Sequence, residues 1–203
     1  FCIMRRVGID VGGTNTDAVL IDGDTVIASI KRPTSADVMK GVVDAIRSVI
    51  DRQPPGSAPV DAVMIGTTHF TNAVVERARL DRVAAIRIAM PAGASLPPMV
   101  DWPEDLRSAV DPLSFMIEGG HEYDGRPLVP LDRQGVRDAA MKIRDAGIET
   151  IGITGLFSPL TAECETEAAE IVRSVIPNAR TTLSHTLGRI GLLERENVAL
   201  LNA

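Results

Sequence analysis

The apolar positions near the N-terminus form short runs separated by polar breaks, a pattern that predicts three consecutive strands. The runs 7–11 and 18–21 flank two adjacent glycines, and the run 25–30 follows an Asp-Gly-Asp turn at 22–24. Strands joined by connections this short pair as antiparallel neighbours. The chain is therefore expected to begin with a three-stranded antiparallel sheet.

The period then changes from that of a strand to that of a helix. Apolar residues recur on one helical face at Val38, Val42, Ala45, Ile46, Val49 and Ile50. This spacing predicts a helix that is capped by Thr34 or Ser35 and ends before the loop 53–59. The compact apolar run 60–66 predicts another strand, which leads directly into a helix that ends near Arg79.

The second half of the chain alternates between predicted strands and helices. We expect strands at 82–89, 149–157 and 180–183, and helices at 132–146, at 161–176 and from about 188. The stretch 90–131 breaks this order, because seven of the thirteen prolines lie there. A long irregular stretch inside a compact domain usually carries function or an added subdomain. We expect an insertion whose turn 119–125 places His121, Glu122 and Asp124 near a ligand, or else simply in solvent.

The overall composition is that of an ordinary soluble globular protein. Hydrophobic residues make up 45% of the 203 positions and charged residues 24%. A net charge of -6 without runs of Lys or Arg argues against a nucleic-acid or anionic-membrane surface. The two cysteines, Cys2 and Cys164, match no metal-ligand spacing, and no apolar run reaches the roughly 18 residues of a membrane span. We expect a cytoplasmic protein.

The first hairpin carries more polar chemistry than a simple reversal needs. Asp10 ends its first strand, Gly12 and Gly13 form the turn, and the polar residues Thr14, Asn15, Thr16 and Asp17 follow. A phosphate group requires close backbone approach with amide and hydroxyl donors, and a magnesium ion requires a carboxylate. The hairpin therefore suits a nucleotide, although the same residues would also suit a solvated turn.

A second polar group follows the strand at 60–66. Thr67 and Thr68 precede a helix, and Asn72 lies one turn into it. The junction of a strand with a helix N-terminus often binds anions in α/β proteins, and it is also where simple N-caps occur. Both interpretations remain open for these residues, and His69 is expected to be a surface or capping histidine.

The order of the elements is that of the ribonuclease H-like ATPase domain found in actin, Hsp70 and the sugar kinases. In that fold class, a mixed sheet is flanked by helices and the first hairpin cradles phosphates. A narrower resemblance rests on linked motifs. In order, these are VGIDVGGTNTDAVLID, IGTTHFTNAVVER, DGRPLVPLD with AGIETIGI, and LSHTLG followed by LLERENVALLNA. Together they resemble the N-terminal region of the hydantoinase/oxoprolinase family, hydantoinase A type.

This resemblance implies an ATPase-like domain over 4–187 with an insertion at about 90–131, and a helix over 188–203 that leads into a C-terminal half. It implies an ATP-dependent hydrolase that opens a cyclic amide such as a hydantoin or 5-oxoproline after phosphorylation of its carbonyl oxygen. The fragment alone is expected to be inactive, and a hydantoinase B-type subunit is a possible partner. Asn15 departs from the Phe common in the family.

Roles for individual residues follow from the same resemblance. Thr14 and Thr16, with the amides of Gly12 and Gly13, are expected to hold the terminal phosphates of ATP. Asp10 is expected to bind Mg²⁺, and Asp17 to orient its water shell or to bond turn amides. The further residues expected to face the nucleotide are Asn15, Thr67, Thr68 and Asn72, and the weaker candidates near the hinge are Ser184, His185 and Glu194. The rivals are an acetone-type carboxylase subunit, a small-molecule kinase and a non-catalytic binding module.

Overall fold

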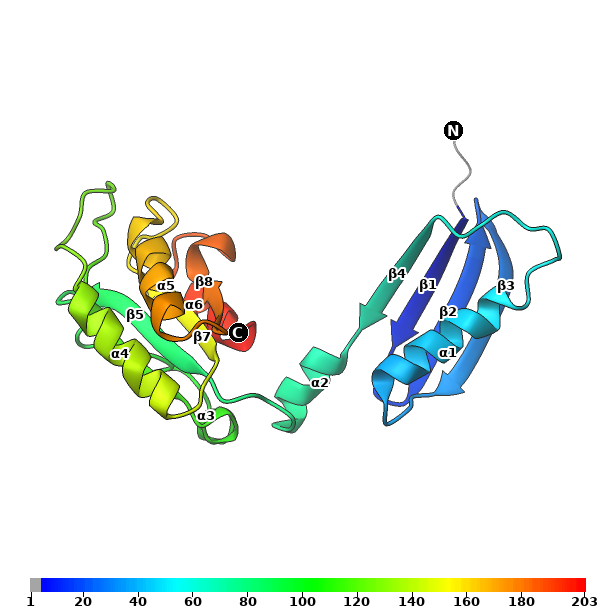
Figure 1. Ribbon diagram of the computed structural model, residues 1–203, viewed down its shortest axis with the longest axis horizontal. Helices are drawn as coiled ribbons and strands as arrows, with labels where there is room; N and C mark the ends of the chain where they lie inside the picture. The colour runs from blue at the N-terminus through cyan, green and yellow to red at the C-terminus, as the bar shows by residue number, and fades with distance from the viewer. Residues whose placement is uncertain (1–4) are drawn as a thin grey trace. The chain divides into compact units, whose positions relative to one another are not determined.

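The chain folds into two compact units. The computed structural model describes residues Arg5–Ala203, and it divides the chain into an N-terminal unit that ends at Ala78 and a C-terminal unit, Arg79–Ala203 (Figure 1). Each unit has its own sheet and its own apolar core. The two units are described separately below.

The N-terminal unit is a four-stranded mixed sheet with one long helix. Its elements are β1 Arg5–Val11, β2 Asn15–Asp22, β3 Thr25–Pro33, α1 Val38–Ile50, β4 Ala62–Thr67 and α2 His69–Glu76. The strand order is β3-β2-β1-β4, in which the first three strands are antiparallel and β4 runs parallel to β1. The predicted opening hairpin and its third strand are confirmed.

Helix α1 begins later than its sequence suggests. Its N-cap is Asp37, whose carboxylate accepts a hydrogen bond from the Lys40 amide at 3.0 Å. The predicted cap Thr34 is used elsewhere, since its amide donates to the Thr14 carbonyl and its hydroxyl to the Gly12 carbonyl. Thr34 therefore stabilises the turn of the first hairpin and does not cap α1.

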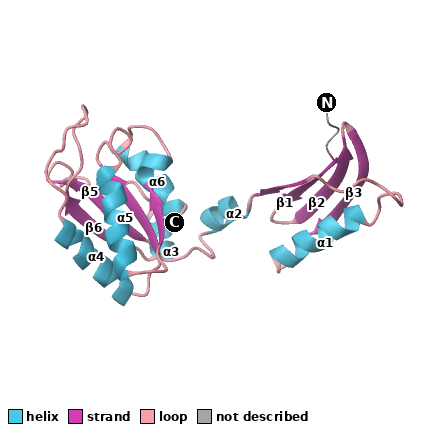
Figure 2. Cartoon of the chain, turned by 45° about the horizontal axis from the view of Figure 1, so that its top comes forward, coloured by secondary structure: helices cyan, strands magenta, loops and turns pink. Residues whose placement is uncertain are grey.

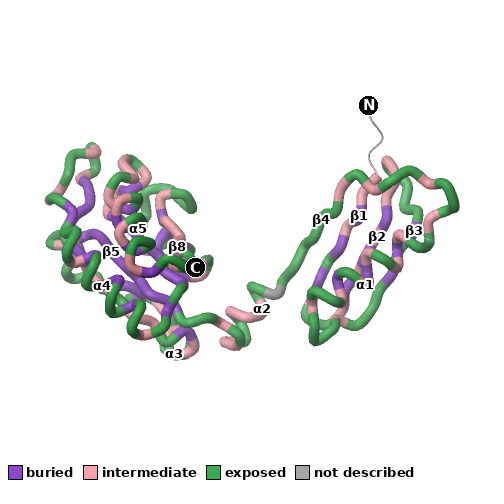
Figure 3. The backbone as a smooth tube through the Cα atoms, in the orientation of Figure 1, coloured by how far each residue is buried: buried purple, intermediate pink, exposed green. Residues whose placement is uncertain are grey.

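One face of this sheet packs on α1 and forms the core of the unit. The buried side chains alternate along the strands, with Val7, Ile9 and Val11 on β1 meeting Ala45 and Val49 on α1. Within this unit, α1 does not cover β4, whose residues are exposed or half-buried along its whole length (Figure 3). The opposite face of the sheet carries the alternate residues and has no helix from the unit's described residues packed on it.

The C-terminal unit is an all-parallel sheet between two layers of helices. Its elements are β5 Ala84–Met90, α3 Glu104–Val110, β6 Leu113–Glu118, α4 Arg133–Asp145, β7 Thr150–Gly155, α5 Glu163–Val175, β8 Arg180–Leu183, the 3-10 turn η1 Ser184–Thr186 and α6 Leu192–Leu201. The strand order is β6-β5-β7-β8. Figure 2 shows the magenta strands of this sheet among the cyan helices. All pairs are parallel, as expected where helices connect successive strands.

Both faces of this second sheet are covered, so its central strands are apolar nearly throughout. Helices α4 and α5 pack on one face against Ile86, Ile88 and Ile153. On the other face, Val83 and Ala85 pack with Val110 of α3 and Leu200 of α6. Every residue of β7 is buried, which is typical of a strand covered on both sides.

Two sequence expectations differ from this architecture. The stretch 90–131 is not wholly irregular, because it contains α3 and the sheet strand β6, which pairs with β5. Helix α6, expected to lead into a C-terminal half, packs within this unit against β7, where Leu200 leaves no space for a side chain at Gly152. In the described part of the chain, no helix has the length and apolar character needed to cross a bilayer.

Candidate functional site

The strand pairing brings the two predicted polar segments of the N-terminal unit to one edge of its sheet. Strands β1 and β4 are parallel neighbours, and Val11 pairs with Thr67 at their carboxyl ends. The turn 12–14 and the start of α2 therefore leave the sheet side by side. Carboxyl ends of adjacent parallel strands are the usual ligand-binding edge of an α/β sheet.

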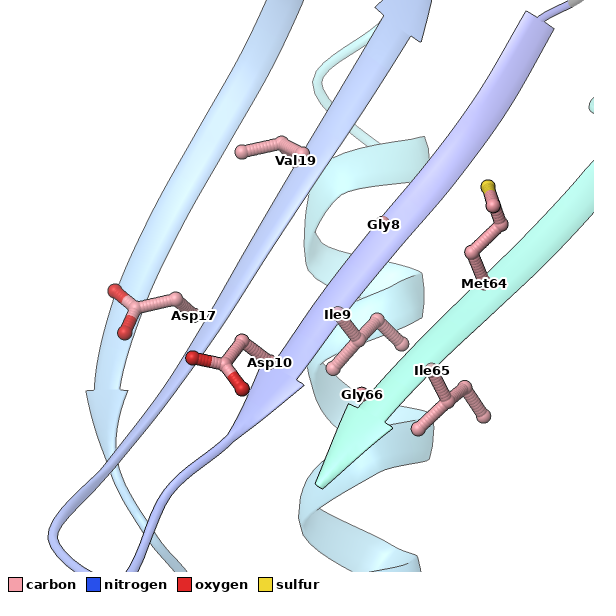
Figure 4. Close-up of a pocket in the computed structure, with 8 residues that line it drawn as sticks. All are labelled: Gly8, Ile9, Asp10, Asp17, Val19, Met64, Ile65 and Gly66. Atoms are coloured by element: carbon pink, nitrogen blue, oxygen red, sulfur yellow. The ribbon is translucent and has the colours of Figure 1, made fainter. Parts of the chain in front are cut away.

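The uncovered face of this sheet presents two carboxylates opposite each other. Asp10 pairs in register with Asp17 across β1 and β2, so both side chains point to the same side, with α1 behind the sheet (Figure 4). They line a cavity of about 470 Å³ whose floor includes Gly8 and Gly66. The absence of side chains at these two glycines leaves the backbone accessible beside Asp10.

Like charges placed directly opposite on a sheet repel each other unless a cation compensates them. One compensating group is Lys31 on β3, whose Nζ lies 3.4 Å from Oδ2 of Asp17, with both side chains solvent-exposed. Asp10 is exposed and has no ion pair among the described residues. A divalent cation near Asp10 would therefore lower the electrostatic energy of this pair.

The glycine turn is held in shape by its own backbone and by Thr34. The Gly12 amide donates to the Asn15 carbonyl at 2.9 Å, and the Thr34 hydroxyl donates to the Gly12 carbonyl at 2.7 Å. The Gly12 amide is thus already used inside the turn. Gly13 and Thr14, at the tip, are exposed.

Asn72 reaches this turn from α2. A side-chain carbon placed at Gly13 would lie 3.0 Å from Nδ2 of Asn72, so glycine makes room for the amide. The same Nδ2 donates to the Thr68 hydroxyl at 3.4 Å, and the Thr68 amide donates to the Val11 carbonyl at 3.2 Å. The structure therefore brings Asn72 and Thr68 to the glycine turn.

The predicted residues do not all lie on the same side. Asn15 and Asp17 share the uncovered face by their alternation along β2, whereas Thr16 is buried on the α1 face. Its hydroxyl lies 3.2 Å from that of Thr34. Thr16 therefore supports the turn from inside the core, which differs from the direct phosphate contact expected of it. Thr67 and Thr68 are exposed at the end of β4. The side chain of His69 is not among those that the structure describes.

A family model for the hydantoinase/oxoprolinase N-terminal region matches residues 6–176. This match covers most of the chain and includes both polar segments described above. The chain belongs to the hydantoinase/oxoprolinase family. The predicted family membership is confirmed. No curated protein matches the sequence of this hydantoinase/oxoprolinase domain.

Two solved structures share the fold of this family member. The nucleotide-free structure of acetone carboxylase, an enzyme of ATP-dependent acetone carboxylation, matches with a TM-score of 0.73 at 20% identity over 98% of this chain. The ATP-dependent caprolactamase from Pseudomonas jessenii matches with a TM-score of 0.72 at 23% identity, also over 98% of this chain. The predicted α/β class, a mixed sheet flanked by helices, is confirmed, and in this chain the strands form two sheets. The chain spans 32% and 31% of those two chains.

The C-terminal unit of this hydantoinase/oxoprolinase chain holds a polar network of which the sequence analysis found only part. Ser184 and His185 were expected as weaker candidates, and both contact the buried carboxylate of Glu165. Glu165, Ser158 and Arg195 were missed. Glu165 lies in the first turn of α5, where acidic residues are common, and no local pattern distinguishes a buried carboxylate from an exposed one. The candidate Glu194 borders a cavity beside α6.

A second buried pair in the same unit joins α6 to β5. The guanidinium of Arg87 binds the carboxylate of Glu196 through Nε at 2.6 Å and through a second nitrogen, and both side chains are almost fully buried. Trp102 and Asn197 add a hydrogen bond of 2.7 Å beside it. Of the turn residues expected near a ligand, His121 is buried, Glu122 is half-buried, and Asp124 pairs with Arg126.

Proposed function

We propose that this chain is the ATP-binding N-terminal region of an enzyme that hydrolyses a cyclic amide in an ATP-dependent reaction. The observation that carries this proposal is the pair Asp10 and Asp17 on an uncovered sheet face beside an exposed Gly-Thr turn, in a member of the hydantoinase/oxoprolinase family. The ATP-dependence of the acetone carboxylase and caprolactamase with the same fold agrees with it.

The donor set fits a magnesium nucleotide. Mg²⁺ is usually held by one or two carboxylates together with phosphate oxygens and water. Among residues Arg5–Ala203, no three His, Cys, Asp or Glu side chains gather into a complete protein-only metal site. We propose that Asp10 holds Mg²⁺, directly or through water, and that Asp17 orients the surrounding water. Bound there, the ion would stabilise charge on the transferring phosphoryl group.

The remaining residues are assigned to binding and positioning. We propose that the exposed amides of Gly13 and Thr14, with the Thr14 hydroxyl, donate to the terminal phosphates, since the Gly12 amide is used within the turn. Asn72 and Thr68 extend this donor set from α2. Asn15, beside the turn, lies on the same face as Asp17, and Thr67 ends β4 at the same edge. Thr16 and Thr34 hold the turn in shape.

This assignment is tested by Asp10→Asn in the complete protein. The substitution keeps the shape of the side chain and removes the charge that binds the ion. We expect amide-dependent phosphate release to fall about 100-fold or more, the order found when a transition-state contact is removed. The matched control is Asp24→Asn, which removes an exposed carboxylate at the turn between β2 and β3. Turnover by Asp10→Asn at the level of the control would contradict the assignment.

The choice of substrate separates the proposed hydrolase from its rivals. Phosphate release should be measured with 5-oxoproline, hydantoins and caprolactam, and with acetone plus bicarbonate. Ring opening with stoichiometric phosphate release supports the hydrolase, whereas turnover only with acetone and bicarbonate indicates a carboxylase subunit. A phosphorylated product that accumulates indicates a kinase. Absence of Mg-ATP binding by calorimetry in the complete protein would indicate a non-catalytic module.

A further inference from the structure

The carboxylate of Glu165 lies at the centre of a buried hydrogen-bond network in the C-terminal unit. Oε1 accepts from the Gly155 amide at 2.7 Å and from the hydroxyls of Ser158 and Ser184, each at 2.6 Å. Oε2 accepts from the His185 amide at 3.0 Å and lies 2.7 Å from Nδ1 of the same residue. Glu165 is fully buried, so these contacts replace the water it loses on folding.

Arg195 determines the direction of the hydrogen bonds that the two serine hydroxyls make in this network. A guanidinium can only donate, and Arg195 donates to the hydroxyls of Ser158 and Ser184 and to the Gly155 carbonyl. Each serine proton is then left to point at Glu165. Burial lowers the pKa of the Arg195 guanidinium from its usual value, and the carboxylates of Glu165 and Glu194 oppose this shift.

The donors around Glu165 also determine which ring nitrogen of His185 carries the proton. Glu165 stays an acceptor because all its other neighbours donate to it, with the Arg195 guanidinium 3.7 Å away. The ring nitrogen that faces it, Nδ1, must therefore carry a proton. In neutral His185, the basic lone pair is then on Nε2, to which no described residue is hydrogen-bonded.

The network lies at the edge of the sheet where ligands usually bind in α/β proteins. Strands β7 and β8 are parallel neighbours; Gly155 ends β7, and Ser184 and His185 directly follow β8, so all three lie at the carboxyl edge of the sheet. The His185 side chain is 20% exposed, whereas that of Glu165 is 0% exposed. A cavity of about 320 Å³ is lined by residues between Leu187 and Val198, and it shares Arg195 with the network.

We propose that His185 is an acid–base group of this enzyme and that Glu165 is its positioning residue. A buried carboxylate that holds Nδ1–H leaves Nε2 as the proton acceptor, which is how general bases are oriented in hydrolases. The hydrogen bond also stabilises the imidazolium formed when Nε2 accepts a proton. This inference rests on the proposed hydrolase function for its substrate, an activated ring amide attacked by water.

When the ring carbonyl oxygen is phosphorylated, the ring nitrogen keeps its hydrogen and the bond becomes C=N⁺–H. The water oxygen then forms a bond to the ring carbon, the π electrons of the C=N bond neutralise the nitrogen, and one water proton passes to Nε2 of His185. When the C–N bond breaks, the nitrogen keeps the electron pair and takes the proton from the imidazolium, which gives a neutral amine. The new hydroxyl loses its proton to solvent and becomes the carbonyl of an acyl phosphate, and attack of a second water on this acyl phosphate releases phosphate and the carboxylate.

The tautomer can be measured on this chain without any substrate. The chain contains three histidines, so ring ¹⁵N NMR spectra are simple to assign by comparison with His185→Asn. We expect neutral His185 to carry its proton on Nδ1. A neutral ring protonated on Nε2 would overturn the proposal whatever the activity of the complete protein.

Two substitutions separate a chemical role of His185 from a structural one. In His185→Asn, the amide nitrogen takes the place of Nδ1 and can still donate to Glu165, but Nε2 is lost. His185→Gln removes the donor at Nδ1. We expect both variants of the complete protein to lose about 100- to 10,000-fold in ring opening, with His185→Asn keeping the wild-type melting temperature. Wild-type turnover by His185→Asn would reduce His185 to a structural role and overturn the proposal.

Glu165→Gln tests the positioning residue against a matched change on the same helix. Glu167→Gln replaces an exposed glutamate that pairs with Arg133, and it should leave turnover unchanged. We expect Glu165→Gln to lower turnover and to shift the His185 ring toward the other tautomer, because Gln can donate a hydrogen bond to Nδ1. An unchanged tautomer in this variant would contradict the assigned role. If wild-type protein releases no phosphate with any amide, the proposed function fails, and the tautomer still decides whether the His185–Glu165 pair exists.

Discussion

The two sheets of this chain differ in how many of their faces are covered. In the C-terminal unit, helices cover both faces, and β5 and β7 are buried almost throughout. In the N-terminal unit, α1 covers one face, and the described residues of that unit leave Asp10, Asp17 and Met64 uncovered on the other (Figures 3 and 4). A covered sheet contributes stability, whereas an uncovered face leaves backbone and carboxylates available to a ligand.

The polar groups differ between the units in the same way. Arg87, Glu196, Glu165 and Arg195 are buried, and each is hydrogen-bonded to a neighbouring side chain or backbone group, although Nε of Arg195 has no partner among the described residues. Asp10 is exposed. Asp17 is half-buried and pairs with the exposed Lys31. Buried charges must be paired to be tolerated, whereas exposed carboxylates cost little and remain free to bind a cation.

The largest expected effect is the loss of the buried ion pair that joins α6 to β5. Arg87→Met leaves the Glu196 carboxylate buried without its cation, which should destabilise the C-terminal unit by about 3–5 kcal/mol. Trp102, the one tryptophan of the chain, lies beside α6, so its fluorescence during urea unfolding reports on this unit. The control Arg133→Met breaks an exposed pair and should cost less than about 1 kcal/mol. Equal effects of both substitutions would contradict the contrast between the units.

The next prediction compares the loss of unfolding free energy when a side chain is truncated in the covered sheet and on the uncovered face. Ile88 is 0% exposed between β6 and β7, and Ile88→Ala should cost about 2–5 kcal/mol of unfolding free energy. Met64 is 59% exposed on β4, and Met64→Ala should change stability by no more than about 0.5 kcal/mol. Urea unfolding followed by Trp102 fluorescence for the first, and by amide hydrogen exchange in β1 and β4 for the second, measures both. A large cost for Met64→Ala would mean that this face is covered in solution.

The smallest predicted effect concerns the support of the glycine turn. Thr34→Val keeps the side-chain shape and removes the hydroxyl that donates to the Gly12 carbonyl and contacts Thr16. We expect a loss of about 1 kcal/mol, confined to the N-terminal unit, because one hydrogen bond is lost. Hydrogen exchange of β1 and β2 amides measures it, with the exposed Thr25→Val as the control. Faster exchange in the C-terminal sheet as well would contradict a local role.

Most elements could be predicted because their signals are local. The hairpin glycines, the alternation along β1 and β2, and the helical spacing of α4 with its Asp132 cap each depend on residues within a few positions. Helix α3 and strand β6 were not predicted, because they lie in a proline-rich stretch. Strand β6 is short, and its pairing with β5 specifies it more than its own sequence does. The cap of α1 is Asp37 because the Thr34 hydroxyl binds the Gly12 carbonyl, 22 residues earlier in the chain.

The sequence by itself determined the family, the alternating order of strands and helices, and the cluster of small polar residues around Asp10. Those features depend on residue types and short spacings. Only the tertiary structure decided that Asp10 and Asp17 share the uncovered face while Thr16 turns into the core, that the chain forms two separate sheets, and that Glu165 and His185 meet beside Arg195. Each of these outcomes depends on strand register or on burial between distant segments, which no local pattern encodes.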